Sequence, residues 1–475
     1  MTTSPIKFGT SGWRGLIADD FTFANVRLAV TAIAEHAKAK AKTPTILVGY
    51  DTRFYSEEFS QLAVDILQGH GVKTLLCETF TPTPAVAYEI QRRKLDGAIN
   101  FTASHNPAPY HGLKFSSADA GPALPEVTKD IEARVVKLIE KGGVPAAVQE
   151  GRGKKDAGEK VNLRENYLKR IEELVRFDVL RKGKTKFVVD ALHGCGAGYL
   201  DRALAEHGVL GQALRLNRDC LFDGTGPDVS EENLAPLCAA VKECGATAGL
   251  ATDGDADRFG IVDRDGTWIQ PNNILALVYD YLVETRKWNM PAARSVATTQ
   301  MVDAAAKTHG QITYQTPVGF KYIGQLIRED KIALGGEESA GLTIRGHVPE
   351  KDGILACLLV AEMIAARGVS IGEQIRAMFK KLGREFWPVR ENLHLSDEQK
   401  ANAVKKVAVD ASTLLGRKVV SIDRTDGAKF VFDDGSWMLL RLSGTEPLLR
   451  LYVEADSAAG SAKLTSEATK WVLES

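Results

Sequence analysis

The sequence lacks the features that would place the protein in a membrane, in an oxidising compartment or on nucleic acid. Its six cysteines are scattered and form no Cys-x-x-Cys pair, which favours a reduced compartment without a structural zinc site. The longest apolar run, Ile354–Ala361, is too short to cross a bilayer. Sixty basic residues balance sixty-one acidic ones, so no global electric field recruits nucleic acid or an acidic membrane.

The start of the chain has no apolar core of the kind found in secretory signals, because Met1–Phe8 is mixed in character. We therefore expect a cytoplasmic protein that binds neither nucleic acid nor membrane. With a net charge of −1, the protein would have to hold an anionic substrate through local arginines and lysines.

Helical and strand patterns alternate along most of the chain. Helical spacing of apolar residues in Val26–Ala41 and Ser56–Gly71 alternates with strand-like runs at Thr45–Gly49 and Val72–Leu76. This alternation predicts α/β units, in which helices cover both faces of a sheet. Further strands are expected at 186–190, 295–299, 312–315 and 332–334.

The end of the chain has a different pattern. A strand-like run at Trp387–Arg390 precedes a helical pattern over Ser396–Leu415, three more strand-like runs, and a final helical pattern over Ala458–Leu473. We expect a smaller α+β domain there. The polar run 149–158 is either a linker or the tip of a long hairpin inside the first domain. The predicted domains are 1–150, 160–265, 266–383 and 384–475.

Ser104 stands in a short polar turn, Thr102–Pro107, directly after the apolar run Asp96–Phe101. The run is typical of a buried strand, and Pro107 prevents a helix from following it. A strand that ends in a stiff turn presents its side chains at the carboxyl edge of a sheet. Ser104 is therefore a candidate nucleophile or phosphate carrier, with His105 beside it; the alternative is an ordinary Ser/Asn-Pro turn.

Three aspartates alternate with small residues in Thr252–Arg258, which follows another short run of small and apolar residues. In an extended loop, Asp253, Asp255 and Asp257 can point to the same side. Three carboxylates this close repel one another unless a cation neutralises them. Their hard oxygens suit Mg²⁺ or Mn²⁺ better than zinc. An acidic surface turn is the alternative interpretation.

Two further loops could bind the parts of a phosphorylated sugar. In Gly335–Gly341, glycines flank Glu337 and Ser339, which offer acceptors to sugar hydroxyls; solvated acids in a glycine-rich turn are the alternative. In the loop between Arg441 and Arg450, nest-like N–H groups, hydroxyls and guanidinium groups are a candidate cradle for a phosphate dianion; a hairpin turn with two arginines on neighbouring strands is the alternative. The small residues of this cradle are Ser443, Gly444 and Thr445.

Together and in this order, the four loops resemble those of the α-D-phosphohexomutase family, which includes phosphoglucomutases and phosphomannomutases. Secondary matches extend along nearly the whole chain. They lie at 8–15, 49–53, 81–84, 110–114, 190–194, 316–322 and 350–353.

The resemblance implies three α/β/α domains with mixed sheets and a smaller fourth domain around a central cleft. It also implies that the active enzyme carries its transferable phosphate on Ser104, with Mg²⁺ held by this phosphoserine and the three aspartates. The substrate would be a hexose phosphate, and moving its phosphate between O1 and O6 would pass through glucose 1,6-bisphosphate. The expected assembly is a monomer or homodimer.

Further roles follow from the same resemblance. The substrate phosphate would bind at Arg441, Ser443, Gly444, Thr445 and Arg450, and Glu337 and Ser339 would bind the O3 and O4 hydroxyls. Acid–base or charge-stabilising roles fall to Lys114, Arg14 and His105, although a turn histidine that binds only backbone is an open alternative for His105. Arg258 and Lys321 are expected to contact substrate, with surface ion pairs as the alternative.

Two positions depart from the family's patterns. His111 stands where an asparagine is usual, and the sugar loop ends Ser339-Ala-Gly341 where many mannomutase-type members have Ser-Gly-His. The missing histidine and the Glu-Glu-Ser sequence favour a phosphoglucomutase. A phosphomannomutase or a dual enzyme is the alternative, ahead of a Mg²⁺-dependent sugar phosphatase and a catalytically silent sugar-phosphate-binding protein.

Overall fold

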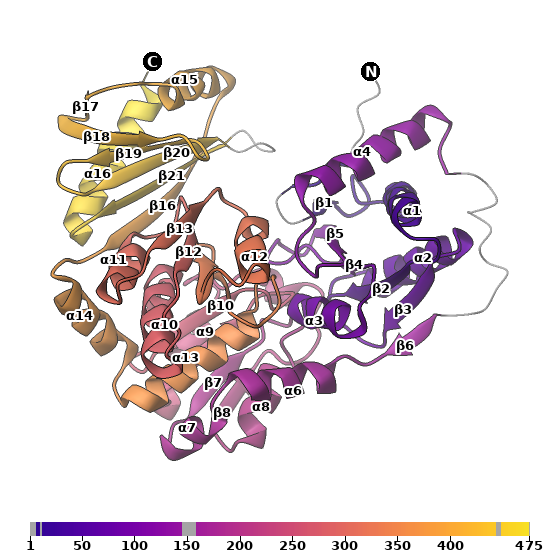
Figure 1. The fold of residues 1–475 in the computed structure, drawn as a ribbon, viewed down its shortest axis with the longest axis horizontal. Coiled ribbons are helices and arrows are strands. Elements are labelled where there is room, and N and C mark those ends of the chain that lie inside the picture. Colours follow the sequence, from indigo (N-terminus) through magenta and orange to yellow (C-terminus); the bar gives the residue numbers. More distant parts are fainter. Residues whose placement is uncertain (1–5, 10–11, 145–157, 443–447, 475) are drawn as a thin grey trace.

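The chain folds into three α/β/α units and a C-terminal unit built on an antiparallel sheet (Figure 1). A computed structural model describes residues 6–9, 12–144, 158–442 and 448–474. The predicted fold class of three α/β/α domains with mixed sheets and a smaller α+β domain is confirmed.

The first sheet places the Ser104 loop. Across the sheet, the strands are β1 (Trp13–Leu16), β5 (Tyr110–Ser117), β4 (Gly97–Phe101), β2 (Thr45–Tyr50), β3 (Lys73–Cys77) and β6 (Glu159–Val161). The central strands are parallel, and β5 runs antiparallel to β4 and β1. On one face lie α1 (Phe23–Lys40), α2 (Ser56–Gly69) and α4 (Pro125–Glu140), and on the other lies α3 (Thr83–Arg93) (Figure 1).

The second sheet places the aspartate loop between two of its strands. Its order is β11 (Trp268–Ile269), β10 (Phe259–Asp263), β9 (Ala248–Thr252), β7 (Phe187–Asp190) and β8 (Leu210–Leu214). Its helices are α6 (Arg164–Leu174), α7 (Phe177–Lys182), α8 (Leu200–Glu206) and α9 (Ala235–Cys244).

The third sheet carries the sugar loop. Its order is β13 (Thr313–Thr316), β12 (Ala292–Ser295), β14 (Leu334–Glu337) and β15 (Gly341–Ile344). Its helices are α10 (Pro271–Arg286), α11 (Met301–Thr308), α12 (Phe320–Arg328), α13 (Gly353–Arg367) and α14 (Ile371–Leu382). Because α13 contacts β9 and β10 as well as β15, it ties the second sheet to the third.

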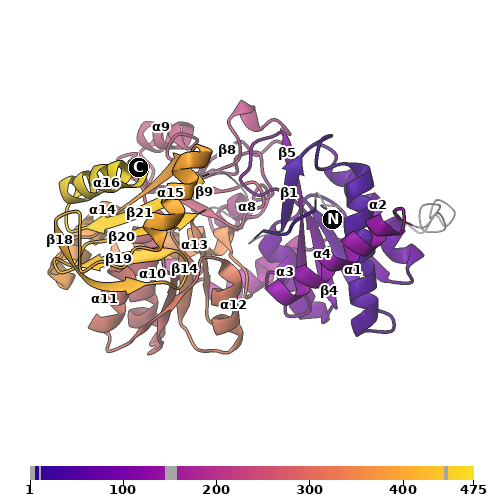
Figure 2. The ribbon, with the colours of Figure 1, turned by 90° about the horizontal axis from the view of Figure 1, so that it is seen from above.

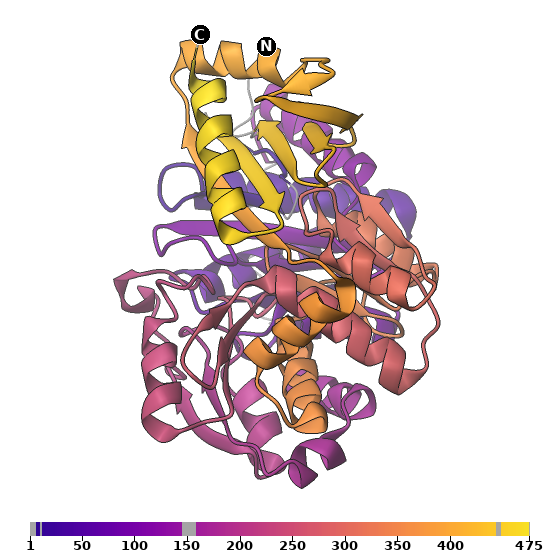
Figure 3. The same ribbon diagram turned by 90° about the vertical axis from the view of Figure 1, so that its left-hand side faces the viewer.

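The fourth sheet is antiparallel throughout and lies apart from the first one (Figure 2). Its order is β16 (Trp387–His394), β21 (Leu448–Ala455), β20 (Trp437–Leu442), β19 (Ala428–Phe432), β18 (Arg417–Asp423) and β17 (Thr413–Leu414). Helices α15 (Asp397–Val407) and α16 (Ala458–Leu473) pack against it (Figure 3).

Two large hydrophobic cores, with a small separate cluster beside α12, divide the described residues unequally. One continuous core runs through the first three units, whereas the fourth has a core of its own. A small apolar cluster joins the third and fourth units, where Val296 and Ala297 contact Trp437, Leu439 and Tyr452. The first three units are therefore fixed to one another more extensively than to the fourth.

Three predicted elements were placed wrongly. The strand expected at 295–299 lies at Ala292–Ser295, because the residues after it form a loop that packs on Trp437. The strand expected at 332–334 begins only at Leu334. The helix expected over 396–415 ends at Val407, and β17 follows it, so a helical pattern was extended across a turn.

No single helix among the described residues is long and apolar enough to cross a membrane. The pair α13 and α14, bent by 77° at its junction, meets the length and composition requirements together.

Candidate active site

The Ser104 loop of the first sheet meets the aspartate loop of the second. Ser104 follows β4, and its Oγ donates a hydrogen bond of 2.7 Å to Oδ2 of Asp253, 149 residues away. The serine is buried and has a left-handed backbone with a φ of +52°. Its N–H donates to Oγ1 of Thr102 at 2.8 Å. The structure thus holds this serine in one orientation, beside a carboxylate from another domain.

A buried arginine that the sequence analysis did not single out organises the serine loop. Arg53 has no exposed surface and lies just after β2. Its guanidinium donates to Oδ2 of Asp51 and to four backbone carbonyls of the loop. These bonds join Nε to Asp51 at 3.0 Å, Nη2 to Ser104 at 2.7 Å and Asn106 at 2.6 Å, and Nη1 to Pro107 at 2.9 Å and Tyr110 at 3.0 Å.

A loop of the second domain packs against Arg53. The guanidinium carbon of Arg53 lies 5.0 Å from the centre of the Phe222 ring, a cation–π contact. Arg218 donates to the backbone carbonyls of Thr52 and Arg53 at 3.0 Å each and forms an ion pair with Glu57. The serine loop therefore depends on side chains from both domains.

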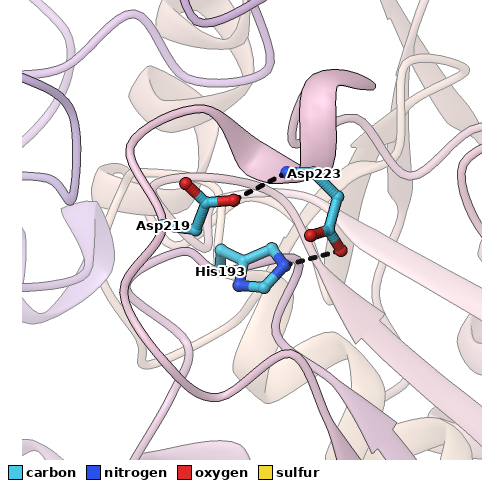
Figure 4. Close-up of side chains that lie close together, drawn as sticks. All are labelled: His193, Asp219 and Asp223. Carbon is cyan, nitrogen blue, oxygen red and sulfur yellow. Dashed lines mark hydrogen bonds and ion pairs between the residues drawn. The ribbon is translucent and has the colours of Figure 1, made fainter.

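The residues His193, Asp219 and Asp223 fold this supporting loop (Figure 4). The ring of His193 contacts Oδ2 of Asp223 at 2.8 Å and the carbonyl of Asn217 at 2.9 Å. Asp219 accepts the backbone N–H of Asp223 at 3.0 Å. Their ligand atoms are close enough together for a metal ion, but their hydrogen bonds are those of a folded turn.

The three predicted metal ligands lie together. Carboxylate oxygens of Asp253, Asp255 and Asp257 are within 4.8 Å of one another, and all three residues are buried. Oδ1 of Asp255 and Oδ1 of Asp257 have no hydrogen-bond partner in the part of the chain that the structure describes. Buried, unpartnered carboxylate oxygens are costly unless a cation binds them. The donor set fits Mg²⁺, which prefers such oxygens.

Two lysines partly neutralise the aspartates. Nζ of Lys114 lies 2.5 Å from Asp255 and 2.8 Å from Asp257, and Nζ of Lys351 lies 3.2 Å from Asp257. Although burial opposes it, the lysines hold the pKa of Asp257 well below its ordinary value. Burial, reinforced by Asp255 and Asp257, raises the pKa of Asp253 well above its ordinary value.

The predicted acid–base residues contact the serine loop or the aspartate loop. Nδ1 of His105 is 3.4 Å from the Ser104 Oγ, and burial, with Arg258 and Arg14, lowers the pKa of His105 well below its ordinary value. Arg14 donates to Oδ1 of Asn106 at 2.6 Å. Despite its burial, Lys114 has a raised pKa, because Asp255 and Asp257 favour its charged form. His105 is therefore neutral at pH 7, and Lys114 is charged.

Arg258 follows the aspartate loop and contributes both its backbone and its charge. Its N–H donates to Oδ1 of Asp253 at 3.0 Å. Its side chain lies 3.9 Å from Asp228, and its buried Nε has no partner among the described residues. The guanidinium keeps donor capacity for an anion.

In the predicted sugar loop, the neighbouring residues Glu337 and Glu338 bind different partners. Oε1 of Glu337 accepts the N–H of Gly319 at 2.7 Å. Burial and the neighbouring Glu338 raise the pKa of Glu337 to about 7. Glu338 instead accepts from Ser295 at 3.0 Å and Thr298 at 3.2 Å.

The other two predicted residues of the third unit are Ser339 and Lys321. Ser339 is half-buried. Nζ of Lys321 lies 5.3 Å from the Tyr322 ring centre, and burial lowers its pKa. No hydrogen bond or ion pair joins Lys321 to the serine or aspartate loop within the described ranges.

The two arginines of the predicted phosphate cradle face each other across β20 and β21. Arg441 and Arg450 are direct cross-strand partners. Arg441 Nε donates to Asp426 at 2.9 Å, whereas the buried Nε of Arg450 has no partner among the described residues. Like charges placed opposite each other repel, and a bound anion relieves that repulsion. The predicted residues Ser443, Gly444 and Thr445 lie outside the described residues.

His111, the departure from the expected asparagine, belongs to the core of the first domain. It is fully buried, stacks on Phe21 at 4.9 Å and contacts the hydroxyl of Ser56 at 3.1 Å. Burial lowers its pKa to about 4. The substitution therefore fills a packing position.

Comparison with known proteins gives a consistent result over the whole chain. Family models described as phosphoglucomutase/phosphomannomutase match four segments in order. They are alpha/beta/alpha domain I over residues 5–141, domain II over 165–266, domain III over 270–382 and the C-terminal domain over 391–470.

Individual relatives cover nearly the full length of the chain. A phosphoglucomutase/phosphomannomutase of Thermococcus kodakarensis is 31% identical over 95% of this chain and 94% of its own. A probable phosphoglucosamine mutase of Methanothermobacter thermautotrophicus is 30% identical over 99% and 98%. The crystal structure of a putative phosphomannomutase from Thermus thermophilus is 31% identical and has a TM-score of 0.85, covering 99% and 100%.

Loss of one aspartate should weaken metal binding selectively. We expect Asp255→Asn to lower the affinity for Mg²⁺ at least about tenfold, because one of three hard anionic ligands is lost. The measurement is a titration of Mg²⁺ by calorimetry. Asp223→Asn is the matched control, since it alters the other acid cluster; an equal loss in both variants would contradict the assignment.

Replacing Arg53 should impair turnover more than substrate binding. In Arg53→Lys the ammonium cannot reach all four carbonyls, so the serine loop shifts and kcat falls about a hundredfold, while KM changes little. Steady-state kinetics measure both constants. Arg134→Lys on α4 is the control, and an unchanged kcat in Arg53→Lys would show that the network has no bearing on Ser104.

Proposed function

Because the chain belongs to the phosphoglucomutase/phosphomannomutase family and is a phosphohexomutase, an intramolecular phosphotransferase, we propose that it interconverts glucose 1-phosphate and glucose 6-phosphate. The observation that carries this proposal is the contact of Ser104 with Asp253, in a site with several buried lysine and arginine side chains. Such a site stabilises charge on a phosphoryl group during transfer.

Ser104 is the phosphoryl carrier in this proposal. The bond from phosphorus to the Ser104 oxygen breaks as a bond to O6 of glucose 1-phosphate forms, which gives glucose 1,6-bisphosphate. The O6 hydroxyl gives up its proton, and the Ser104 oxygen regains one. Mg²⁺, when bound by the three aspartates and the phosphoserine, supplies positive charge beside the transferring group.

The surrounding side chains are assigned proton transfer and charge stabilisation. Lys114, held charged by the aspartates, is the proposed proton donor to the Ser104 oxygen. His105, neutral and 3.4 Å from that oxygen, is the proposed proton acceptor. Arg14 stabilises charge, because its guanidinium stays protonated even with a pKa lowered to about 10 by burial and by Arg258.

Both orientations of the bisphosphate use the same binding groups. Arg441, Arg450 and the loop Ser443, Gly444 and Thr445 hold whichever phosphate is not reacting. Glu337 and Ser339 accept from the O3 and O4 hydroxyls, and Arg258 and Lys321 contact the substrate. After turning over, the bisphosphate returns its other phosphate to Ser104 and leaves as glucose 6-phosphate.

The preference for glucose rests on the sugar loop, where Ala340-Gly341 stands in place of the Gly-His found in many mannomutase-type members. A phosphomannomutase or dual activity is the second candidate, since the relatives carry names of both kinds. We further propose a cytoplasmic monomer or homodimer with domains at 1–150, 160–265, 266–383 and 384–475.

Activity assays on two sugars test the substrate. With Mg²⁺ and a trace of glucose 1,6-bisphosphate, we expect kcat/KM for glucose 1-phosphate to exceed that for mannose 1-phosphate at least about tenfold, and Ser104→Ala to abolish both reactions. Equal values would make the enzyme dual. Release of inorganic phosphate as the main product would replace the mutase by a phosphatase.

The ionisation of Glu337 should appear in the pH profile. Since its pKa is about 7 in the free protein, the carboxylate that accepts from sugar hydroxyls is present above pH 7 and is lost as the pH falls. We expect kcat/KM to drop between about pH 8 and about pH 6. In Glu337→Gln, kcat/KM should be lower and should depend less on pH, because only the titration of the substrate phosphate remains. The same pH dependence in both proteins would contradict the role of Glu337 in sugar binding.

A further inference from the structure

One carboxylate oxygen joins the phosphate cradle to the neighbouring domain. Asp426 lies in the turn between β18 and β19 of the fourth domain. Its Oδ2 accepts from Nε of Arg441 at 2.9 Å and from the backbone N–H of Val318 at 3.0 Å. Val318 belongs to the third domain and precedes α12, so this oxygen connects a cradle arginine to a loop beside the sugar site.

The next amide along that loop binds the sugar acceptor. The N–H of Gly319 donates to Oε1 of Glu337 at 2.7 Å. Gly319 has a φ of +128°, a conformation that favours glycine. Two successive N–H groups therefore bind Asp426 and Glu337, and a shift of Val318, which lies between these two peptide groups, moves both contacts.

The turn that carries Asp426 is held by internal hydrogen bonds and contacts the third domain. Asp423 accepts from the N–H of Thr425 at 2.8 Å and from its hydroxyl at 2.5 Å. A Cβ on Gly427, whose φ is +91°, would lie 2.3 Å from the carbonyl oxygen of Leu440. Asp423 also accepts a hydrogen bond from Gln315 on β13. The turn thus meets the third domain at two points.

We propose that Asp426 is a positioning residue that couples phosphate recognition by Arg441 to sugar recognition by Glu337. The inference rests on the proposed function. Asp426 binds the Nε of Arg441, and no partner of the two Nη groups is found among the described residues, so these groups are the proposed donors to the substrate phosphate. When a phosphate fixes Arg441, Asp426 fixes the backbone at Val318, and with it the adjoining Gly319 N–H that orients Glu337.

Coupling distinguishes this role from simple support of Arg441. If Asp426 only oriented Arg441, its loss would weaken inorganic phosphate and a hexose phosphate by the same factor. If it couples the two subsites, the hexose phosphate loses more, because its sugar contacts are loosened as well. Contacting residues that act as a unit also show non-additive effects in double variants.

The experiment is calorimetric titration of the full-length protein in Mg²⁺ with inorganic phosphate and with glucose 1-phosphate. For Asp426→Asn, which keeps an acceptor oxygen but no charge, we expect Kd to rise about tenfold for glucose 1-phosphate and at most about threefold for phosphate. Glu337→Gln should weaken glucose 1-phosphate less in the Asp426→Asn background than alone. Equal losses for both ligands, or additive losses in the double variant, would overturn the coupling.

Two further variants secure the result. Asp434→Asn makes the same substitution in the β19–β20 turn and should change neither Kd. Asp426→Glu keeps the charge but displaces it by one methylene, and it should show the same unequal losses; equal losses there would also overturn the proposal. A wild-type protein that binds glucose 1-phosphate no tighter than phosphate and lacks mutase activity would instead refute the proposed function.

Discussion

Three buried carboxylates beside Ser104 are the constraint on which the rest of the site depends. Asp253, Asp255 and Asp257 repel one another in a medium that screens poorly, and the phosphate dianion that we propose on Ser104 would add to that repulsion. Lys114 from the first domain and Lys351 from the third contact the aspartates of the second. The lysines therefore neutralise the aspartates only when the three domains are assembled. One continuous hydrophobic core holds these domains together.

The fourth domain is attached differently, and its attachment suits a binding role. Its core is separate, and its contacts with the third domain are a small apolar cluster and a set of polar bonds. Lys429 donates to the carbonyl of Val296 at 2.9 Å, and Glu454 accepts the N–H of Gln300 at 3.1 Å. These bonds, like that of Asp426, end on loops of the third domain. The fourth domain is thus joined to the third through loop contacts rather than through a shared core.

Local patterns in the sequence were enough to predict the fold class, the Ser104 turn and the grouping of the three aspartates, because each depends on residues close together in the chain. Local patterns do not identify Arg53 and Lys351 as site residues, although both stand in segments, 49–53 and 350–353, that match the family. Their roles depend on partners far away in sequence: Arg53 binds carbonyls 51 to 57 positions along the chain. Lys321 stays a prediction as a substrate contact, because its Nζ lies 5.3 Å from the Tyr322 ring centre and the structure holds no substrate.

Mass spectrometry of the intact protein and its peptides tests the central claim most directly. The protein would be mixed with glucose 1,6-bisphosphate and Mg²⁺, and then chased with glucose 1-phosphate. The account predicts one phosphoryl group, carried on Ser104, that stays in buffer and is discharged by the sugar phosphate. A phosphoryl group on another residue, or one lost to water as fast as to the sugar phosphate, would contradict it.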